Sequence, residues 1–107
     1  DTVNQKNITI PENEIIYAQA DNIYAEVVTA QGIFLYSNKI SLLVKKLNEE
    51  YFYRSNRSYI VNFNYIIGYS KKEIEFSNGQ KALISSSKFK DFKSKYLNYL
   101  KRKSIGE

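Results

Sequence analysis

The chain has 107 residues, 43% of them hydrophobic and 15% aromatic, which is enough to build one packed domain without disulfides or metal ions. It contains no Cys, His, Met or Trp, which excludes thiol nucleophiles, histidine acid–base chemistry and Cys/His metal sites. The formal net charge of +5 lies at one end, because basic and acidic residues balance over residues 1–85 and the whole excess falls within residues 86–107.

A polar segment opens the chain over residues 1–7, without an initiator Met, and we interpret it as a flexible linker from an upstream domain. Four runs rich in Ile, Val, Tyr, Phe and Thr follow, a composition typical of short strands. Turn-forming Pro, Asn, Asp and Gly residues separate these runs. The expected strands cover residues 7–10, 15–18, 23–29 and 33–36.

A helix is predicted next, because four apolar residues between Ile40 and Leu47 recur at helical spacing. Ser37 or Asn38 would cap its N-terminus. The apolar face of this helix should pack on a sheet.

A second series of strands is expected over residues 51–54, 59–63, 65–69, 73–76 and 80–84, with Asn78-Gly79 as the strongest hairpin signal. Alternation along these strands predicts which side chains enter the core. Asn62 ends an apolar run, and we expect it to make a structural hydrogen bond. The expected core residues are Tyr59, Val61, Phe63, Ile66, Phe76 and Leu83.

The second predicted helix begins at Ser86 or Ser87 as N-cap and carries an apolar stripe. Lysines occupy its other face. A basic amphipathic helix can lie on an anionic membrane, but an aromatic stripe at this spacing is more typical of packing against a core. We expect residues 101–107 to form a frayed basic tail. The stripe consists of Phe89, Phe92, Tyr96 and Leu100.

Two arginines, Arg54 and Arg57, lie in a short polar break between two predicted strands. Their planar guanidinium groups are suited to phosphates and guanine edges, although surface charges in an ordinary turn would look the same. The acidic residues lie mostly at alternating strand positions or at a helix end, where solvent exposure explains them. No Gly-rich phosphate loop occurs. We therefore expect neither catalysis, nor a cofactor, nor a metal site.

The sequence from Phe52 to Asn62, Phe-Tyr-Arg-Ser-Asn-Arg-Ser-Tyr-Ile-Val-Asn, is followed by Ile66-Ile67, Asn78-Gly79 and Ala82-Leu83-Ile84-Ser85. In this order and spacing it resembles the second half of a LytTR DNA-binding domain. The first half agrees through Glu14-Ile15-Ile16-Tyr17, Asp21-Asn22-Ile23-Tyr24 and Ile40-Ser41-Leu42-Leu43. The resemblance covers residues 8–100, which we take as the domain.

This resemblance implies a mostly β fold with two short helices, in an elongated β-β-β arrangement of small, mainly antiparallel sheets. It implies sequence-specific binding of double-stranded DNA by loops that enter major grooves, as the output domain of a bacterial transcription regulator. The sequence has no apolar run long enough to span a bilayer and no signal-peptide pattern at its start, so we expect a cytoplasmic location. Members of the family usually follow a receiver domain in a two-component system. They bind paired direct repeats as homodimers.

The same resemblance points to three loops as the DNA contacts. In the first loop, Asn22 would contact a base edge and Tyr24 a phosphate. In the second, Arg57 would read a base beside Asn56, with Arg54 or Ser58 holding a phosphate. The third loop, at the start of the last helix, would hold a phosphate through backbone N–H groups and a lysine. The residues of this third loop are Ser86, Ser87 and Lys88.

The chain departs from the family pattern at two of these positions. Asn56 stands where the family commonly has His, and an amide there would prefer adenine, which would alter the sequence preference. Ser86-Ser87 stands where the family tends to have Arg, so that loop would hold phosphate without reading a base.

Two other function classes fit parts of the sequence. The ten tyrosines would suit a single-stranded nucleic-acid-binding module that stacks bases on aromatic rings. The basic last helix would suit a protein-interaction or membrane-surface module. Binding to anionic vesicles that survives loss of Arg57 would identify the latter.

Overall fold

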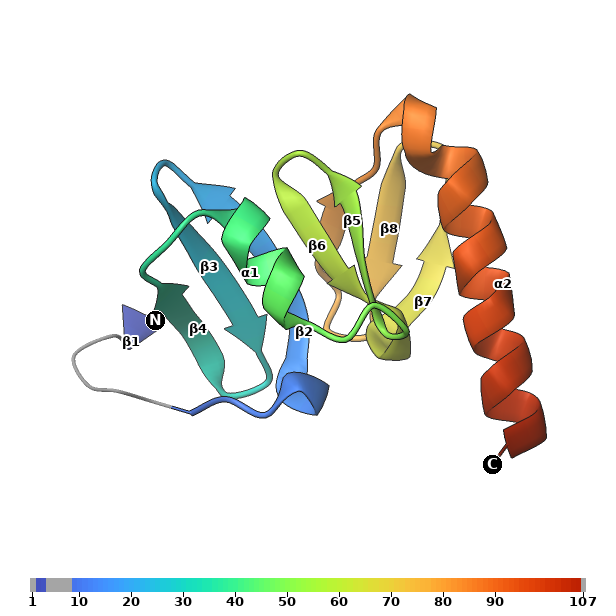
Figure 1. The fold of residues 1–107 in the computed structure, drawn as a ribbon, viewed down its shortest axis with the longest axis horizontal. Coiled ribbons are helices and arrows are strands. Elements are labelled where there is room, and N and C mark those ends of the chain that lie inside the picture. The colour runs from blue at the N-terminus through green and yellow to red at the C-terminus, as the bar shows by residue number, and fades with distance from the viewer. Residues whose placement is uncertain (1, 4–8, 107) are drawn as a thin grey trace.

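The computed structural model describes residues 2–3 and 9–106 and contains two β-sheets with two α-helices (Figure 1). The molecule measures 39 × 31 × 26 Å along its principal axes. All strand pairs are antiparallel except one. The mostly β fold with mainly antiparallel sheets is therefore confirmed.

The first sheet has six strands in the order β1-β4-β3-β2-β6-β5. Strand β2 pairs with both β3 and β6 and so joins the two halves of the chain in one sheet. The short β1 runs parallel to β4. The strands are β1 (Thr2–Val3), β2 (Ile15–Asp21), β3 (Tyr24–Thr29), β4 (Gly32–Tyr36), β5 (Phe52–Asn56) and β6 (Tyr59–Asn62).

Helix α1 (Ile40–Lys46) packs on one face of this sheet, where its buried Ile40 and Leu43 join Phe52 and Ile60 in a hydrophobic cluster. The predicted apolar face is thus confirmed. The predicted caps are wrong, because Lys39 is the residue before the helix and neither Ser37 nor Asn38 caps it through its side chain. The amide oxygen of Asn38 instead accepts a hydrogen bond from the N–H of Lys39, which precedes the helix, whereas a cap accepts from an N–H of the first helical turn.

The second sheet has three strands in the order β7-β8-β9: β7 (Ile66–Tyr69), β8 (Glu73–Phe76) and β9 (Lys81–Leu83). The predicted Asn-Gly turn connects β8 to β9, and Gly79 adopts φ 87°, which a residue with a Cβ rarely does. The Gly79 N–H donates to the Phe76 carbonyl at 2.9 Å and closes the turn.

Helix α2 (Phe89–Gly106) covers the second sheet along the right side of Figure 1. Phe92, Tyr96 and Tyr99 pack against Phe63 and form an aromatic core. The helix continues through residues 101–106, so the expected frayed tail is wrong over that range.

The start of α2 also differs from the expectation. Ser86 and Ser87 are not caps, because they form the 3-10 turn η3 (Ser86–Lys88) that leads into the helix. Two further 3-10 turns, η1 (Glu12–Glu14) and η2 (Phe63–Tyr65), precede β2 and β7.

Two residues expected to pack inward are wrong by a single position. In the stripe of α2, Leu100 is 42% exposed whereas its neighbour Tyr99 is buried, and Leu83 is the second case. Leu83 is 49% exposed, whereas Ala82 and Ile84 on either side of it are buried. Ala82 pairs across the sheet with buried Ile74, and cross-strand partners share a face. Leu83 therefore faces outward.

At the N-terminal end, the expected strand over residues 7–10 is not found at Thr9 and Ile10, and residues 7 and 8 lie outside the described residues. Within the expected linker, Thr2–Val3 form a strand and so are not a free segment, while residues 1 and 4–7 are likewise outside the described part.

The predicted structural role of Asn62 is confirmed. Its side chain is fully buried, donates to the Ile15 carbonyl at 2.7 Å and accepts from the Asn64 N–H at 2.9 Å. These bonds tie the end of β6 to the start of β2 and to η2.

Candidate nucleic-acid interface

The three loops expected to contact DNA lie along one edge of the molecule, at the top of Figure 1. They are the β2–β3 hairpin turn, the β5–β6 turn and the segment from β9 through η3 to α2. Backbone hydrogen bonds of 2.8 Å link them, from the Ala20 N–H to the Ser58 carbonyl and from the Ser85 N–H to the Ser55 carbonyl. Because these bonds fix neighbouring loops to one another, the spacing of the three loops is set by the fold.

The first loop is a two-residue turn between the paired residues Asp21 and Tyr24. Asn22 adopts φ 62°, a left-handed conformation that Asn tolerates better than most residues. Asn22 is exposed, and Tyr24 is 42% exposed. Both predicted contact residues are therefore accessible at this turn.

The second loop carries Arg57 at its exposed tip. Asn56 stabilises the turn, because its side-chain oxygen accepts a hydrogen bond from the Ser58 N–H at 2.7 Å. Because an amide oxygen has two lone pairs, this bond orients the Asn56 side chain without using its whole capacity to accept. Below the turn, buried Ser55 donates its hydroxyl to the Leu83 carbonyl at 2.8 Å and holds β5 beside β9.

Arg54 lies under the same loop and holds it from below. Its Nη2 donates to the Arg57 carbonyl at 2.6 Å. Its Nε is buried and makes no hydrogen bond within the described residues. Lys88 supports the strand in turn, since its Nζ donates to the Arg54 carbonyl at 3.1 Å and lies 5.8 Å from the centre of the Tyr53 ring. Arg54 and Lys88, two of the predicted phosphate contacts, thus also support the β5–β6 turn.

The third loop exposes Ser86 and Ser87, while Lys88 is half-buried. Beneath it, the Tyr53 hydroxyl donates to the Asp91 carboxylate at 2.9 Å. Burial is the main cause that raises the pKa of Tyr53, and the hydrogen bond to Asp91 raises it further. This contact joins β5 to the first turn of α2, next to the loop.

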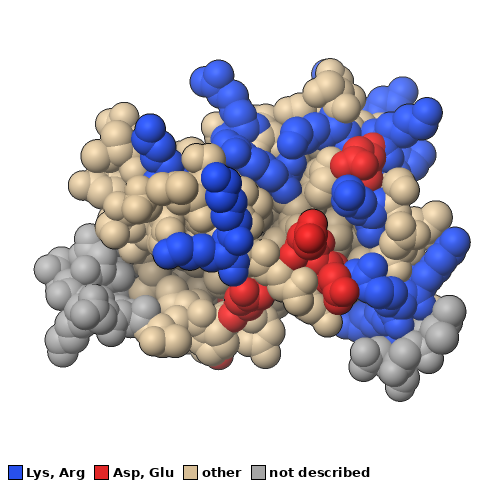
Figure 2. Space-filling view, in the orientation of Figure 1, with Lys and Arg blue, Asp and Glu red and all other residues tan. Residues whose placement is uncertain are grey.

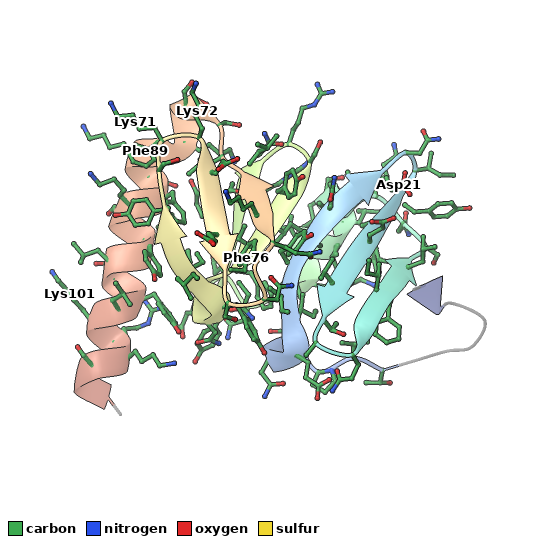
Figure 3. All side chains as sticks on the ribbon, turned by 180° about the vertical axis from the view of Figure 1, so that it is seen from behind. Asp21, Lys71, Lys72, Phe76, Phe89 and Lys101 are labelled. Atoms are coloured by element: carbon green, nitrogen blue, oxygen red, sulfur yellow. The ribbon has the colours of Figure 1, made fainter. Side chains whose placement is uncertain are left out.

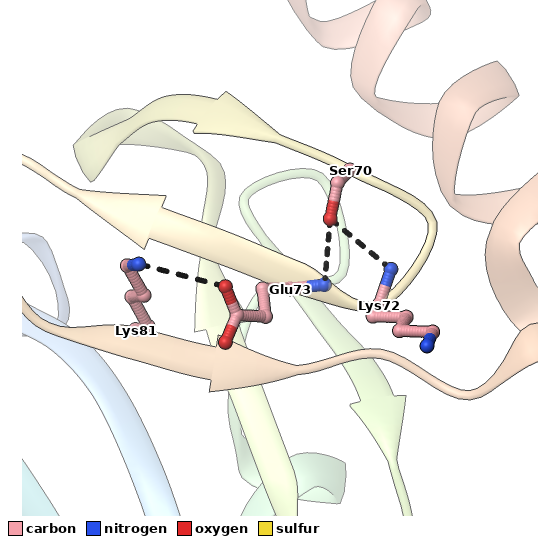
Figure 4. Close-up of polar contacts among 4 residues, drawn as sticks. All are labelled: Ser70, Lys72, Glu73 and Lys81. Atoms are coloured by element: carbon pink, nitrogen blue, oxygen red, sulfur yellow. Dashed lines mark hydrogen bonds and ion pairs between the residues drawn. The ribbon is translucent and has the colours of Figure 1, made fainter.

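Figure 2 shows basic side chains along the upper edge of the molecule and also at its middle left and lower right, whereas most of the acidic ones lie toward its lower middle. Over residues 9–104, where side chains are described, the structure shows one ion pair, between Lys81 and Glu73 at 3.5 Å (Figure 4). Within those same limits no group of side chains could hold a metal ion.

One basic loop at this edge was missed by the sequence analysis. Lys71 and Lys72 lie in the turn between β7 and β8, and Figure 3 places them near Phe89, along the same edge that carries Asp21 at its other end. The sequence signal was two adjacent lysines beside a serine. These lysines did not stand out in the sequence because basic and acidic residues are equal in number over residues 1–85.

A cavity of about 510 Å³ lies at the opposite end, between η1, η2 and the last turns of α2. Glu50, Asn64 and Arg102 are among its lining residues. None of the predicted contact residues lines it, so the cavity is separate from the loop edge.

No helix among the described residues is long and apolar enough to cross a membrane.

Comparison with known proteins decides the family. A family model described as the LytTr DNA-binding domain matches residues 5–97, most of the chain. The chain belongs to the LytTR family of DNA-binding domains. The resemblance noted in the sequence is thereby confirmed, and this LytTR domain is assigned to DNA binding.

A solved structure shares the fold of this LytTR domain: the LytTr DNA-binding domain of a protein described as a methyl-accepting/DNA response regulator from Bacillus cereus. The TM-score is 0.72 at 22% sequence identity, and the match covers 84% of this chain and 86% of that one. No curated protein matches the chain. The likeness to the solved structure supports the two-sheet architecture.

Proposed function

We propose that this LytTR domain binds double-stranded DNA sequence-specifically, through loops inserted into major grooves, and serves as the output domain of a bacterial transcription regulator. The observation that carries the proposal is the tethered edge of three loops, with Arg57 exposed at the tip of the central one. A guanidinium presented from a fixed turn can donate two parallel hydrogen bonds to guanine.

The proposed contacts divide between base reading and backbone positioning. Arg57 and Asn22 read base edges, because both are exposed at the tips of hairpin turns. Asn56, beneath Arg57, contributes through its amide group, which the bond from the Ser58 N–H orients. The proposed phosphate contacts are Tyr24, Arg54, Ser58, Ser86, Ser87 and Lys88.

The proposed setting follows from this activity. The domain would act in the cytoplasm, downstream of a receiver or sensor domain, in a two-component system. It would occupy paired direct repeats as a homodimer. No residue of the loop edge is assigned a catalytic role, and the proposal requires neither cofactor nor metal.

Replacement of Arg57 by Ala tests the proposal directly. Loss of a bidentate base contact should cost roughly 1–3 kcal/mol of specific duplex binding and relax the preference at one base pair. Fluorescence anisotropy with specific and random duplexes measures both effects. Arg102→Ala is the matched control, because it removes the same charge at the opposite end of the molecule. Unchanged specific affinity for Arg57→Ala would contradict the proposed role.

Selection from a pool of random duplexes tests the wider proposal. Enrichment of two direct repeats about one helical turn apart would support a pair of domains on DNA. Equal or tighter binding to single strands would favour the base-stacking module instead. Binding to anionic vesicles that Arg57→Ala leaves intact would favour the membrane-surface module.

A further inference from the structure

The turn between β7 and β8 is a fourth basic loop on the edge that carries the three proposed DNA contacts. Its lysines, Lys71 and Lys72, are both exposed. The family resemblance did not point to this turn, and the local sequence is not part of any of the three loops. Its position beside them is a property of the folded chain (Figure 3).

The turn has a fixed shape. The Ser70 N–H donates to the Glu73 carbonyl at 2.8 Å, and the Ser70 hydroxyl oxygen accepts from the N–H groups of Lys72 and Glu73 at 3.2 Å each (Figure 4). A serine that holds its turn in this way limits the conformations of the two lysine backbones. The ammonium groups are therefore presented from an ordered base.

The turn is also joined to the third loop. The Ile84 N–H donates to the Lys72 carbonyl at 3.0 Å, and Ile84 lies two residues before Ser86 of the third loop. Because this bond continues past the last pair of β9, the β7–β8 turn and the β9–η3 segment keep a constant separation. A duplex held by the third loop would thus meet the lysine turn at a defined place.

The charge of the turn is available for a partner. Glu73, the nearest acidic residue in the sequence, pairs with Lys81 across the sheet at 3.5 Å. Neither Lys71 nor Lys72 has an ion-pair partner among the side chains described over residues 9–104. Two unpaired ammonium groups at the end of a DNA-binding edge suit the phosphates of the same duplex.

We infer that Lys71 and Lys72 form a fourth, sequence-independent contact to the DNA backbone, which extends the interface from the third loop along the second sheet. This inference rests on the proposed binding of duplex DNA. Lysine acts here as a point charge, so the contact adds affinity and fixes orientation but reads no base.

The test compares Lys71→Ala/Lys72→Ala with Lys45→Ala/Lys101→Ala, which removes equal charge from α1 and from the lower half of α2. Affinities for the selected duplex and a random duplex are measured by anisotropy between 50 and 200 mM salt. The slope of log affinity against log salt concentration is negative, and each lost phosphate contact should reduce its magnitude by about 0.9. Between 50 and 200 mM salt, the affinity of Lys71→Ala/Lys72→Ala should therefore fall by a factor about tenfold smaller than that of the unmodified domain. The ratio of its affinities for the selected and the random duplex should not change.

The outcomes separate this inference from the function on which it rests. A salt slope equal to that of the control variant would overturn the fourth contact, as would a selective loss for the specific duplex. Failure of the unmodified domain to bind any duplex would overturn the proposed function itself. Thermal unfolding checks that both variants remain folded, and the anchoring bonds use backbone atoms that the substitutions retain.

Discussion

Arg54 and Arg57 are three residues apart, yet the structure gives them different surroundings. The Arg57 side chain is exposed at the tip of the β5–β6 turn, whereas the Arg54 guanidinium donates to the Arg57 carbonyl from below. The Nε of Arg54 is buried, so a phosphate could reach only the outer nitrogens of its guanidinium. Arg54 is therefore placed to fix the conformation of the turn that carries Arg57, in addition to the phosphate contact proposed for Arg54 itself.

Arg54→Lys separates these two roles. Lysine keeps the charge but lacks the planar fork that reaches the turn. We expect the variant to keep nonspecific affinity and salt slope, and to lose roughly fivefold in discrimination between specific and random duplexes, equivalent to about 1 kcal/mol for one hydrogen bond. Anisotropy with both duplexes measures the ratio. An unchanged ratio would mean that the bond to Arg57 contributes nothing to recognition.

At the scale of elements, α2 matters because one stripe of aromatic side chains fastens it to both β5 and the second sheet. Phe92 is fully buried, and its ring centre lies 5.8 Å from that of Tyr53 and 5.3 Å from that of Tyr69. The opposite face of the helix is solvated, with Leu97 52% exposed. The packing of this stripe sets where the third loop, which precedes the helix, lies relative to the second.

Truncation of Phe92 to Ala should destabilise the domain by about 3–5 kcal/mol, because it removes a large buried ring and leaves a cavity. Leu97→Ala is the control on the same helix, and we expect it to change stability by no more than about 0.5 kcal/mol. Urea unfolding followed by circular dichroism measures both. Similar losses for the two variants would mean that α2 is not held by its aromatic stripe.

At the scale of the whole molecule, one hydrophobic cluster runs from β2 through β5 and β6 to the second sheet and α2. Tyrosine rings make up part of it, and burial raises the pKa of Tyr17, Tyr53 and Tyr96. In all three cases burial is the largest cause. The folded state therefore holds the phenol protons more tightly than the unfolded chain does.

Stability should consequently fall at alkaline pH. Below the ordinary tyrosine pKa of about 10 both states keep these protons, and above it the unfolded chain releases them first, which favours unfolding until pH passes the raised folded-state values. Urea unfolding at pH 8, 10 and 11 should show this decline. Tyr53→Phe should be less stable at pH 8, because it loses the bond to Asp91, but should lose less between pH 8 and 11. A steeper alkaline decline for Tyr53→Phe would contradict this account.

The strands from residue 15 onward, the apolar face of α1 and the hydrogen-bonding role of Asn62 could be predicted from the amino-acid sequence. Alternation with a period of two residues, helical spacing and turn residues all act between near neighbours in the chain. The sequence also indicated the family, through the order and spacing of residues 52–62 and 78–85.

Other features depend on contacts between segments that are distant in the sequence. Leu83 faces outward because Ala82 pairs with Ile74 across the sheet, and Arg54 supports Arg57 because the turn folds its carbonyl back over β5. Lys72 joins the loop edge through a bond to Ile84, twelve residues along the chain. Each of these features depends on the pairing of two segments. Local propensity does not predict that pairing, because strand register and proximity are set by the packing of the whole sheet.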